Sequence, residues 1–174
     1  YTTQSGQTNY VWSVPGVLNT DYTITSGGAG STDNTVTLQW LTAGSKTVTV
    51  NYTDANGCTG ASPASNTTTV SALPTTSNAG SDQTICANGS AVLAANIPVA
   101  GTGEWSVVSG PSTSNSQFGN NTLPSVNFVP AGWPGAYLIR WTISNPPCAA
   151  STSELTVAVI AAPTLADAGP NQTI

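Results

Sequence analysis

Apolar and polar residues alternate most clearly over residues 136–144, the longest strand-like stretch of the chain. Every second residue there is apolar, namely Tyr137, Ile139, Trp141 and Ile143, and the residues between them are polar apart from Leu138. Such alternation predicts a strand with one buried face and one solvent-facing face. Residues 47–53 repeat the pattern, with Val48, Val50 and Tyr52 on one face and threonine or asparagine on the other.

Shorter stretches of the same kind recur about every ten residues, separated by Gly, Pro and Asn turn signals. The further predicted strands are 9–14, 22–25, 35–40, 67–70, 91–95, 104–108, 125–129 and 153–160. The chain is rich in Thr, Ser, Asn and Gly and has 12 Pro, which disfavours helix. We therefore expect an all-β chain of immunoglobulin-like β-sandwich domains.

Two copies of one unit follow each other along the chain. Ala79-Gly80 and Ala168-Gly169 begin matching segments 89 positions apart (168 − 79 = 89), and Pro74 and Pro163 have the same spacing. A repeat of this length indicates tandem globular domains rather than a solenoid of short repeats.

The repeat places the expected domain boundaries. We predict a first domain at 1–72 that lacks its N-terminal part, a linker at 73–78, and a complete domain at 79–160. A second linker is expected at 161–167, followed at 168–174 by the first strand of a third repeat. The counterpart of Cys86 in the first domain would precede Tyr1, so the chain is expected to be a section of a longer polypeptide.

Charge is scarce, and this scarcity limits the partners that the chain can have. Charged residues make up 5% of the sequence, the net charge is −5, and Lys46 and Arg140 are the only cations. This excludes binding to nucleic-acid phosphates and to anionic lipid, since both require clustered cations. No apolar run approaches the roughly 18 residues of a membrane span, so direct membrane insertion is not expected. Cysteines in turns and a Thr/Ser/Asn-rich surface favour an extracellular, cell-surface location.

The three cysteines are all predicted to lie in or next to turns. Cys86 and Cys148 are the only pair within the complete domain, and we predict a disulfide between them; the alternative is two buried thiols. Cys58 occupies the position of Cys148 in the first domain, and it is expected to be unpaired or to pair with a residue outside the sequence.

Catalysis is not expected, because the chain has no His and its seven acidic residues are not clustered. No zinc or EF-hand pattern is present, so no cofactor is predicted. A calcium ion held at a domain junction by Asp82, Asp167 and backbone carbonyls remains an open alternative. In the competing interpretation these two acids accept hydrogen bonds from the linker backbone.

Five aromatic residues fall on the apolar side of predicted strands and are assigned to the cores: Trp12, Trp40, Trp105, Tyr137 and Trp141. Trp133 differs, because it lies in a Gly/Pro turn. It is a candidate for stacking on a sugar ring or on a neighbouring domain, or else it folds back over the end of the sandwich.

Several segments resemble PKD domains. They include Tyr10-Val11-Trp12 before a Pro-Gly turn, the run from Thr53 to Cys58, and Trp105 to Pro111. The cysteine-containing versions resemble the tandem PKD-like and Ig-like repeats of giant cell-surface adhesins of the Bacteroidota, including gliding-motility adhesins. The resemblance implies an Ig-like sandwich that is secreted and displayed on the cell surface.

The leading hypothesis is a stalk segment of a long adhesin or filament, in which the short linkers at Pro74 and Pro163 hold successive repeats semi-rigidly. Its partners would be neighbouring repeats of the same polypeptide, with a surface glycan or a protein as receptor. An alternative is a glycan- or protein-binding accessory module of a secreted hydrolase that uses Trp133. A further alternative is a filament subunit completed by a strand from a neighbouring chain.

Overall fold

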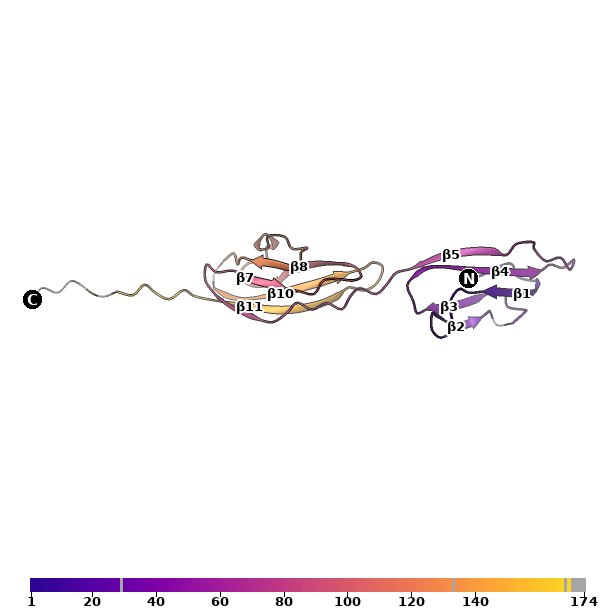
Figure 1. The fold of residues 1–174 in the computed structure, drawn as a ribbon, viewed down its shortest axis with the longest axis horizontal. Coiled ribbons are helices and arrows are strands. Elements are labelled where there is room, and N and C mark those ends of the chain that lie inside the picture. Colours follow the sequence, from indigo (N-terminus) through magenta and orange to yellow (C-terminus); the bar gives the residue numbers. More distant parts are fainter. Residues whose placement is uncertain (29, 133, 168, 170–174) are drawn as a thin grey trace, which may run out of the picture. The chain divides into compact units, whose positions relative to one another are not determined.

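The computed structural model describes residues 1–28, 30–132, 134–167 and 169. The chain divides into two compact units, Tyr1–Ala72 and Leu73–Ile174, and both are built from strands (Figure 1). The predicted all-β fold is confirmed. Among the described residues, the one helical element is a short 3-10 turn, η1 (Asn115–Gln117), which the sequence pattern did not predict.

The second unit is a sandwich of two unequal sheets. Its larger sheet has the order β6-β11-β10-β8, and its smaller sheet pairs β7 with β9. The strands are β6 (Gln83–Cys86), β7 (Ala91–Ala94), β8 (Thr102–Ser109), β9 (Ser125–Phe128), β10 (Gly135–Ser144) and β11 (Ser151–Ile160). β10 is antiparallel to both β8 and β11, whereas β6 runs parallel to β11. The first and last strands of the unit are therefore direct neighbours.

The core of the second unit lies between these sheets. Tyr137, Ile139, Trp141 and Ile143 are all fully buried, as the alternation in β10 predicts. Trp141 faces Trp105 of β8 directly across the sheet, and their ring centroids are 5.0 Å apart. Phe128 of β9 closes the core from the other sheet and contacts Tyr137 edge-on. Large aromatic side chains of this kind supply most of the apolar area that such a small domain buries.

The first unit has the same hairpin but fewer strands. Its main sheet has the order β1-β4-β5, formed by β1 (Thr8–Ser13), β4 (Gly44–Thr53) and β5 (Ala64–Val70). A second sheet pairs β2 (Tyr22–Gly27) with β3 (Val36–Trp40), and Thr2 bridges to Thr35 beside β3. The hairpin of β4 and β5 corresponds to that of β10 and β11.

Trp12 and Trp40 are half-buried, in contrast to the fully buried Trp105 and Trp141, so their assignment to the core needs correction. No strand among the described residues pairs with the outer edge of β5, where β6 pairs with β11 in the second unit. Trp12 borders an open hollow of about 230 Å³ that is also lined by Tyr1 and Val48. Trp40 lies on the two-stranded sheet, with the ring of Tyr22 as its aromatic neighbour.

Most of the predicted linker 73–78 is attached to the second unit. The Thr75 N–H donates to the Ala100 carbonyl at 3.0 Å, and the Ser77 N–H donates to Ser151 Oγ at 2.9 Å. Ser77 is buried, as is Ala79, whose N–H donates to Ser153 Oγ. The boundary falls between Ala72 and Leu73, but the chain becomes part of the next sandwich only a few residues later.

Candidate functional site

The functional groups of the second unit gather at its two ends. We call the end where β11 finishes at Ile160 the outgoing end. The opposite end, where the turn 145–150 joins β10 to β11 and where Ser77 docks against Ser151, is the incoming end. Cysteines lie at both ends.

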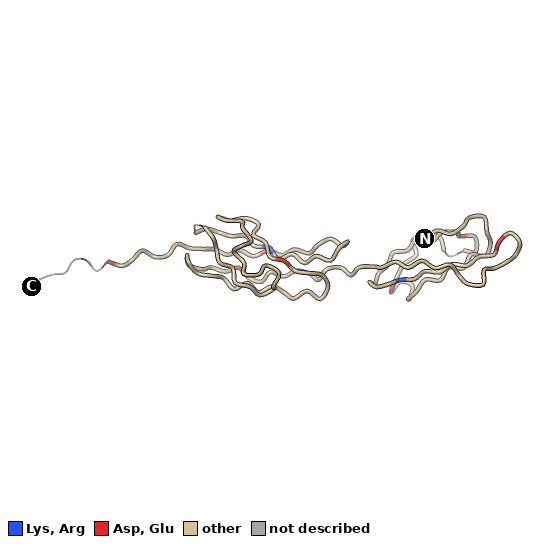
Figure 2. The backbone as a smooth tube through the Cα atoms, turned by 90° about the horizontal axis from the view of Figure 1, so that it is seen from above, with Lys and Arg blue, Asp and Glu red and all other residues tan. Residues whose placement is uncertain are grey.

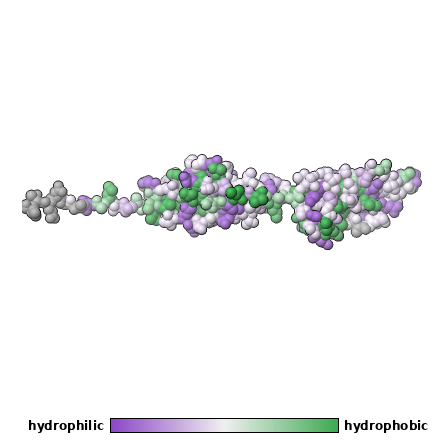
Figure 3. All heavy atoms as spheres, viewed as in Figure 1, coloured by the Kyte–Doolittle hydropathy of each residue, from purple (hydrophilic) through white to green (hydrophobic). Residues whose placement is uncertain are grey.

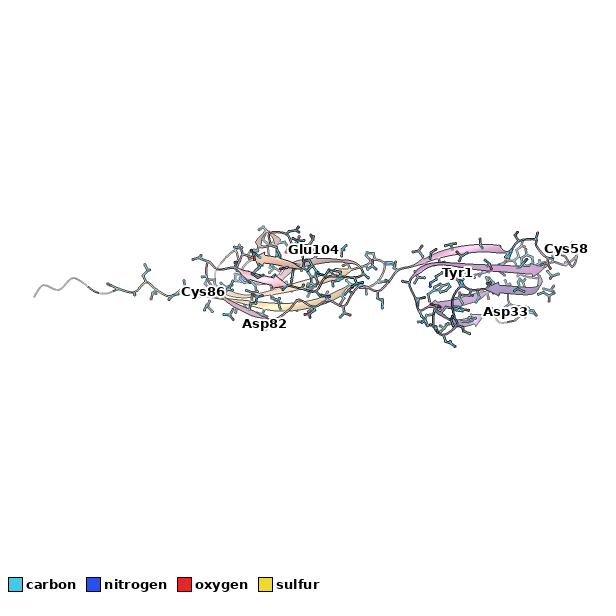
Figure 4. The ribbon with its side chains drawn as sticks, in the orientation of Figure 1. Tyr1, Asp33, Cys58, Asp82, Cys86 and Glu104 are labelled. Carbon is cyan, nitrogen blue, oxygen red and sulfur yellow. The ribbon has the colours of Figure 1, made fainter. Side chains whose placement is uncertain are left out.

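Cys86 lies at the outgoing end. It is the last residue of β6 and is in register with Ile160, the last residue of β11. The Ala87 N–H donates to the Ile160 carbonyl at 2.7 Å, which fixes the turn that follows. The Cys86 carbonyl accepts the Gly89 N–H, and Asn88 adopts a positive φ of 69° between them. The thiol is free and exposed at the end from which the C-terminal segment leaves (Figure 4).

Cys148 lies at the incoming end. Its N–H donates to the Asn145 carbonyl at 3.1 Å, and this bond closes the turn after β10. Pro146 and Pro147 are joined by a cis peptide bond within the same turn. The cysteine side chain is half-buried.

The predicted disulfide between Cys86 and Cys148 is not formed, and this prediction is wrong. Strand β11 separates the two ends of the sheet, from Ser151 near Cys148 to Ile160 beside Cys86. A strand of that length spans roughly 30 Å at about 3.3 Å per residue. A disulfide needs Cα atoms within about 7 Å. The sandwich therefore holds these two cysteines apart.

In the first unit, Cys58 occupies the hairpin position that corresponds to Cys148. It lies in the turn between β4 and β5, where Asp54 Oδ1 accepts the backbone N–H groups of Asn56 and Cys58, each at 2.8 Å. The Asp54 N–H donates in return to the Cys58 carbonyl at 2.9 Å. These hydrogen bonds, with the one from the Cys58 N–H as the largest cause, lower the pKa of the Asp54 carboxyl below 3.8. The Cys58 thiol is exposed at the tip of the hairpin (Figure 4).

Asp82 and Asp167, the two candidate calcium ligands, each accept a hydrogen bond from a backbone N–H group. Asp82 Oδ1 accepts the Thr156 N–H at 2.7 Å, beside β11, and Asp167 Oδ1 accepts the Gly169 N–H at 2.8 Å. Throughout the part of the chain that the structure describes, no three His, Cys, Asp or Glu residues form a cluster that could hold a metal ion. Figure 2 shows that charged residues are few in both units, and among them Arg140 and Glu154 form an ion pair.

Trp133, the candidate stacking residue, lies outside the described residues. The segment that precedes it is tied to the sandwich by a buried amide. Gln117 Oε1 accepts the Ala131 N–H at 2.7 Å, and its Nε2 donates to the carbonyls of Ser112 and Ser114. The Ala131 carbonyl accepts the Tyr137 hydroxyl at 3.1 Å. The hydrogen bonds that Gln117 accepts and donates were not predicted, because an isolated Gln in a polar loop has no sequence signature.

Apolar residues are also exposed on the second unit. An open hollow of about 400 Å³ lies between the ends of β7 and β9, lined by Ala94, Ala95, Ile97, Leu123, Pro124 and Ser125. Figure 3 shows apolar residues as separate spots among polar ones on the face in view. Scattered apolar exposure of this kind is usual for globular domains and does not by itself define a ligand.

Two further polar groupings in the first unit were not predicted. Asp21 accepts the Val17 N–H and the Thr42 hydroxyl, and these hydrogen bonds lower its carboxyl pKa below 3.8. Lys46 donates to Thr42 and lies 5.6 Å from the ring centroid of Trp40, within cation–π range. The hydrogen bonds of Asp21 and the contacts of Lys46 both stabilise turns next to β3 and β4.

Comparisons with known proteins give structural neighbours but no match in sequence. Neither a protein-family model nor a curated protein sequence matches the chain. Among solved structures, extracellular domains 3–5 of Drosophila OTK align over 87% of the chain with a TM-score of 0.52 at 15% identity, and the chain spans about half (51%) of that structure. Tandem Ig repeats of Dlar align with a TM-score of 0.41, 10% identity and coverage of 89% of this chain and 84% of that one. Human CDH23 EC21–23 gives a TM-score of 0.45, 10% identity and coverage of 92% and 65%.

The sheet topology and the likeness to the OTK domains define the fold class of the chain. The chain consists of tandem Ig-like β-sandwich repeats, and the likeness to OTK domains supports this architecture alone. None of the described residues belongs to a helix that is both long and apolar enough to cross a membrane.

Proposed function

We propose that the chain is a structural segment of the stalk of a long, secreted cell-surface adhesin or filament. In this role the repeats provide length and mechanical strength and perform no catalysis. The resemblance of the sequence to PKD-like repeats of Bacteroidota adhesins, gliding-motility adhesins among them, supports the same class of parent protein. The architecture of tandem Ig-like repeats supports an extracellular location.

The parallel pairing of β6 with β11 is the observation on which this proposal rests. The chain enters the second unit before Gln83 and leaves it after Ile160, and these strands lie side by side with Gln83 paired to Val157 and Cys86 to Ile160. Tension applied along the chain would therefore pull the two strands past each other in opposite directions. In this shear geometry all the hydrogen bonds between the strands resist together, whereas in a hairpin opened from one end they break singly.

Single-molecule force spectroscopy tests this function. One preparation would be pulled through residues 73 and 167, which loads β6 and β11 in shear. The matched preparation would be pulled through residues 135 and 160, which lie at the same end of β10 and β11 and so load that hairpin in an unzipping direction. We expect a several-fold higher unfolding force in the first geometry. Equal forces in the two geometries would contradict a load-bearing role.

The accessory-module alternative makes a different prediction, which a glycan array can test. Under the stalk proposal, the folded chain and its Trp133→Ala variant should both give background signals. Specific retention of a glycan by the unmodified chain, lost in the Trp133→Ala variant, would instead favour a binding module.

A further inference from the structure

The outer edge of β5 in the first unit is an open strand edge. No strand among the described residues pairs with it, and most of the residues of β5 are exposed (Figure 1). The pairing of β5 with β4 has no bulge, and β5 contains no charged residue and no proline. Proteins usually protect a free edge with such features, because its unpaired N–H and C=O groups can bind another strand. The edge of β5 therefore lacks the usual protection against an added strand.

The second unit shows how the corresponding edge is covered. Residues 77–86 run along β11, first through the Ala79 N–H, which donates to Ser153 Oγ at 3.1 Å, and then through the parallel pairing of β6. Ala79 is fully buried in the core, and Ile85 packs against that core. This docked segment (residues 77–86) thus pairs with the edge of the sheet and also fills space beneath it.

The first unit has a hollow at the place that corresponds to Ala79. At the 89-residue spacing of the two units, Ser153 corresponds to Ala64 (153 − 64 = 89). Ala64 lines the open hollow of about 230 Å³ that Trp12 borders, and Val50 lines it as well. A residue in the place of Ala79 would therefore fill this hollow. We call the outer edge of β5 together with this hollow the acceptor site.

Another segment of the chain repeats the docked segment. Residues 166–174 match it at the 89-residue spacing, with the same Ala-Gly pair and the same Gln-Thr-Ile run. Asp167 Oδ1 accepts the Gly169 N–H at 2.8 Å, as Asn78 Oδ1 accepts the Gly80 N–H at 3.0 Å. Both glycines have a positive φ, 77° and 89° respectively. The two segments therefore share a local turn as well as a sequence pattern.

We propose that residues 166–174 of one copy of the chain insert as a donor strand into the acceptor site of a second copy, parallel to β5. Ala168 would fill the hollow, and Gln172–Ile174 would pair with Thr68–Val70, as Ala79 and β6 do in the second unit. This inference goes beyond the proposed stalk function and does not depend on it. It gives copies of the chain a way to join head to tail.

The connection to the donor strand favours a second copy as its partner. The edge of β11, which is the acceptor edge of the donor's own unit, is already occupied by β6. The connector 161–165 reaches at most about 20 Å. That is less than the roughly 30 Å length of β11, and the first unit is joined to the chain at the other end of this strand, before Ser77.

Sedimentation equilibrium of the full chain tests the self-association. We expect the average mass to rise continuously between micromolar and millimolar concentration, because every added copy brings one donor strand and one acceptor site. Ala168→Arg should remain monomeric throughout, since its counterpart Ala79 is fully buried and leaves no room for a longer side chain. Leu165→Arg is the matched control. It adds the same charge in the connector, where Leu165 is 98% exposed, and should associate like the unmodified chain.

A mixture of two variants tests the head-to-tail arrangement. Ala64→Arg alters the acceptor site and leaves the donor strand intact, whereas Ala168→Arg does the opposite. Each variant alone should be monomeric. An equimolar mixture should form a dimer and no larger species, because only one intact donor strand and one intact acceptor site can meet. A mixture that stays monomeric would overturn the proposal, provided that circular dichroism shows both variants folded.

Hydrogen exchange locates the contact on β5. The Thr67 N–H corresponds to the Thr156 N–H, which Asp82 of the docked segment accepts at 2.7 Å. Its exchange should therefore slow in the oligomers and stay fast in monomeric Ala168→Arg. Equal exchange in both samples would contradict insertion at this edge.

Two further results would overturn the proposal. One is an unmodified chain that stays monomeric at millimolar concentration, even if a free peptide of residues 166–174 bound to the first unit, because the donor would then have another source. The other is a set of oligomers that persists in Ala168→Arg. Neither result bears on the stalk function, since the force measurements can be made on the monomeric Ala168→Arg variant.

Discussion

Trp105 and Trp141 face each other across adjacent antiparallel strands, with their rings inclined by 47° and both side chains fully buried. The Trp105 indole N–H donates to the Leu123 carbonyl at 3.1 Å. The pair thus connects the centre of the larger sheet to the loop that precedes β9. Tilted aromatic pairs of this kind contribute about 0.5–1.5 kcal/mol beyond the area that they bury.

We expect Trp105→Ala to destabilise the second unit by about 3–5 kcal/mol, the usual cost of removing a fully buried Trp. The matched change Trp12→Ala in the first unit should cost clearly less, because Trp12 is already half-exposed beside an open hollow. Urea unfolding of each variant, followed by circular dichroism, would measure both effects. Equal losses would show that Trp12 is as deeply packed as Trp105.

Gly103→Ala should also be costly, because the indole of Trp141 covers this glycine. A Cβ at residue 103 would lie only 2.0 Å from Trp141 Cζ2, which is inside van der Waals contact. Inserting a group into a packed core in this way costs about 1–3 kcal/mol. Gly119→Ala is the control, since nothing lies within 4 Å of the place that its added methyl group would take. A melting temperature unchanged by Gly103→Ala would disprove the close contact.

Gln117→Ala should loosen the turn before β10. Its side chain is 2% exposed and uses both amide atoms, so its loss leaves the Ala131 N–H and two carbonyls without these partners. Ala131 and Ser114 are exposed, so water can take over part of these interactions, and each lost hydrogen bond should cost about 0.5–1.5 kcal/mol. We expect faster hydrogen exchange at the Ala131 amide together with lower stability. Gln39→Ala, on an exposed position of β3, should change neither quantity.

The turn that contains Cys58 should open in acid. The folded pKa of Asp54 lies below 3.8, so its stabilising hydrogen bonds are complete above that pH and are lost as pH falls through the folded value. We expect the exchange protection of the Cys58 amide, corrected for the intrinsic pH dependence of exchange, to decline only below about pH 4. In Asp54→Asn this acid-dependent decline should be absent. Loss of protection at neutral pH in the unmodified chain would contradict the assignment.

Arg140→Gln should have little effect despite the ion pair with Glu154. The two groups are 2.6 Å apart, but their side chains are 40% and 37% exposed. Exposed pairs of this kind contribute about 0–1 kcal/mol and are screened by salt. Thermal unfolding in low and high salt should therefore differ little between the variant and the unmodified chain. A loss comparable to that of Trp105→Ala would mean that the pair is part of a larger network.

The strands were predictable because alternation is a local property. The burial of Tyr137 to Ile143 follows from alternation alone, and the same rule locates β4. The disulfide was not predictable, since sequence spacing does not say at which end of a sheet each cysteine emerges. Trp12 was assigned to the core for a related reason. Alternation gives the face of β1 on which Trp12 lies, but the burial of its side chain depends on residues that are distant in the sequence. The parallel pairing of β6 with β11 likewise joins strands that are distant in the sequence, and the local residue pattern does not predict it.

The pairing of β6 with β11 makes the thermal stability and the mechanical stability of the second unit depend on different strands. Under tension the load path runs through β6 and β11, while β7, β8 and β9 lie to the side of it. Core replacements in these three strands should lower the melting point more than the unfolding force, whereas a replacement at an exposed position of β6, such as Thr84, should lower the unfolding force more than the melting point. The melting temperature and the unfolding force would therefore vary independently from one repeat to the next.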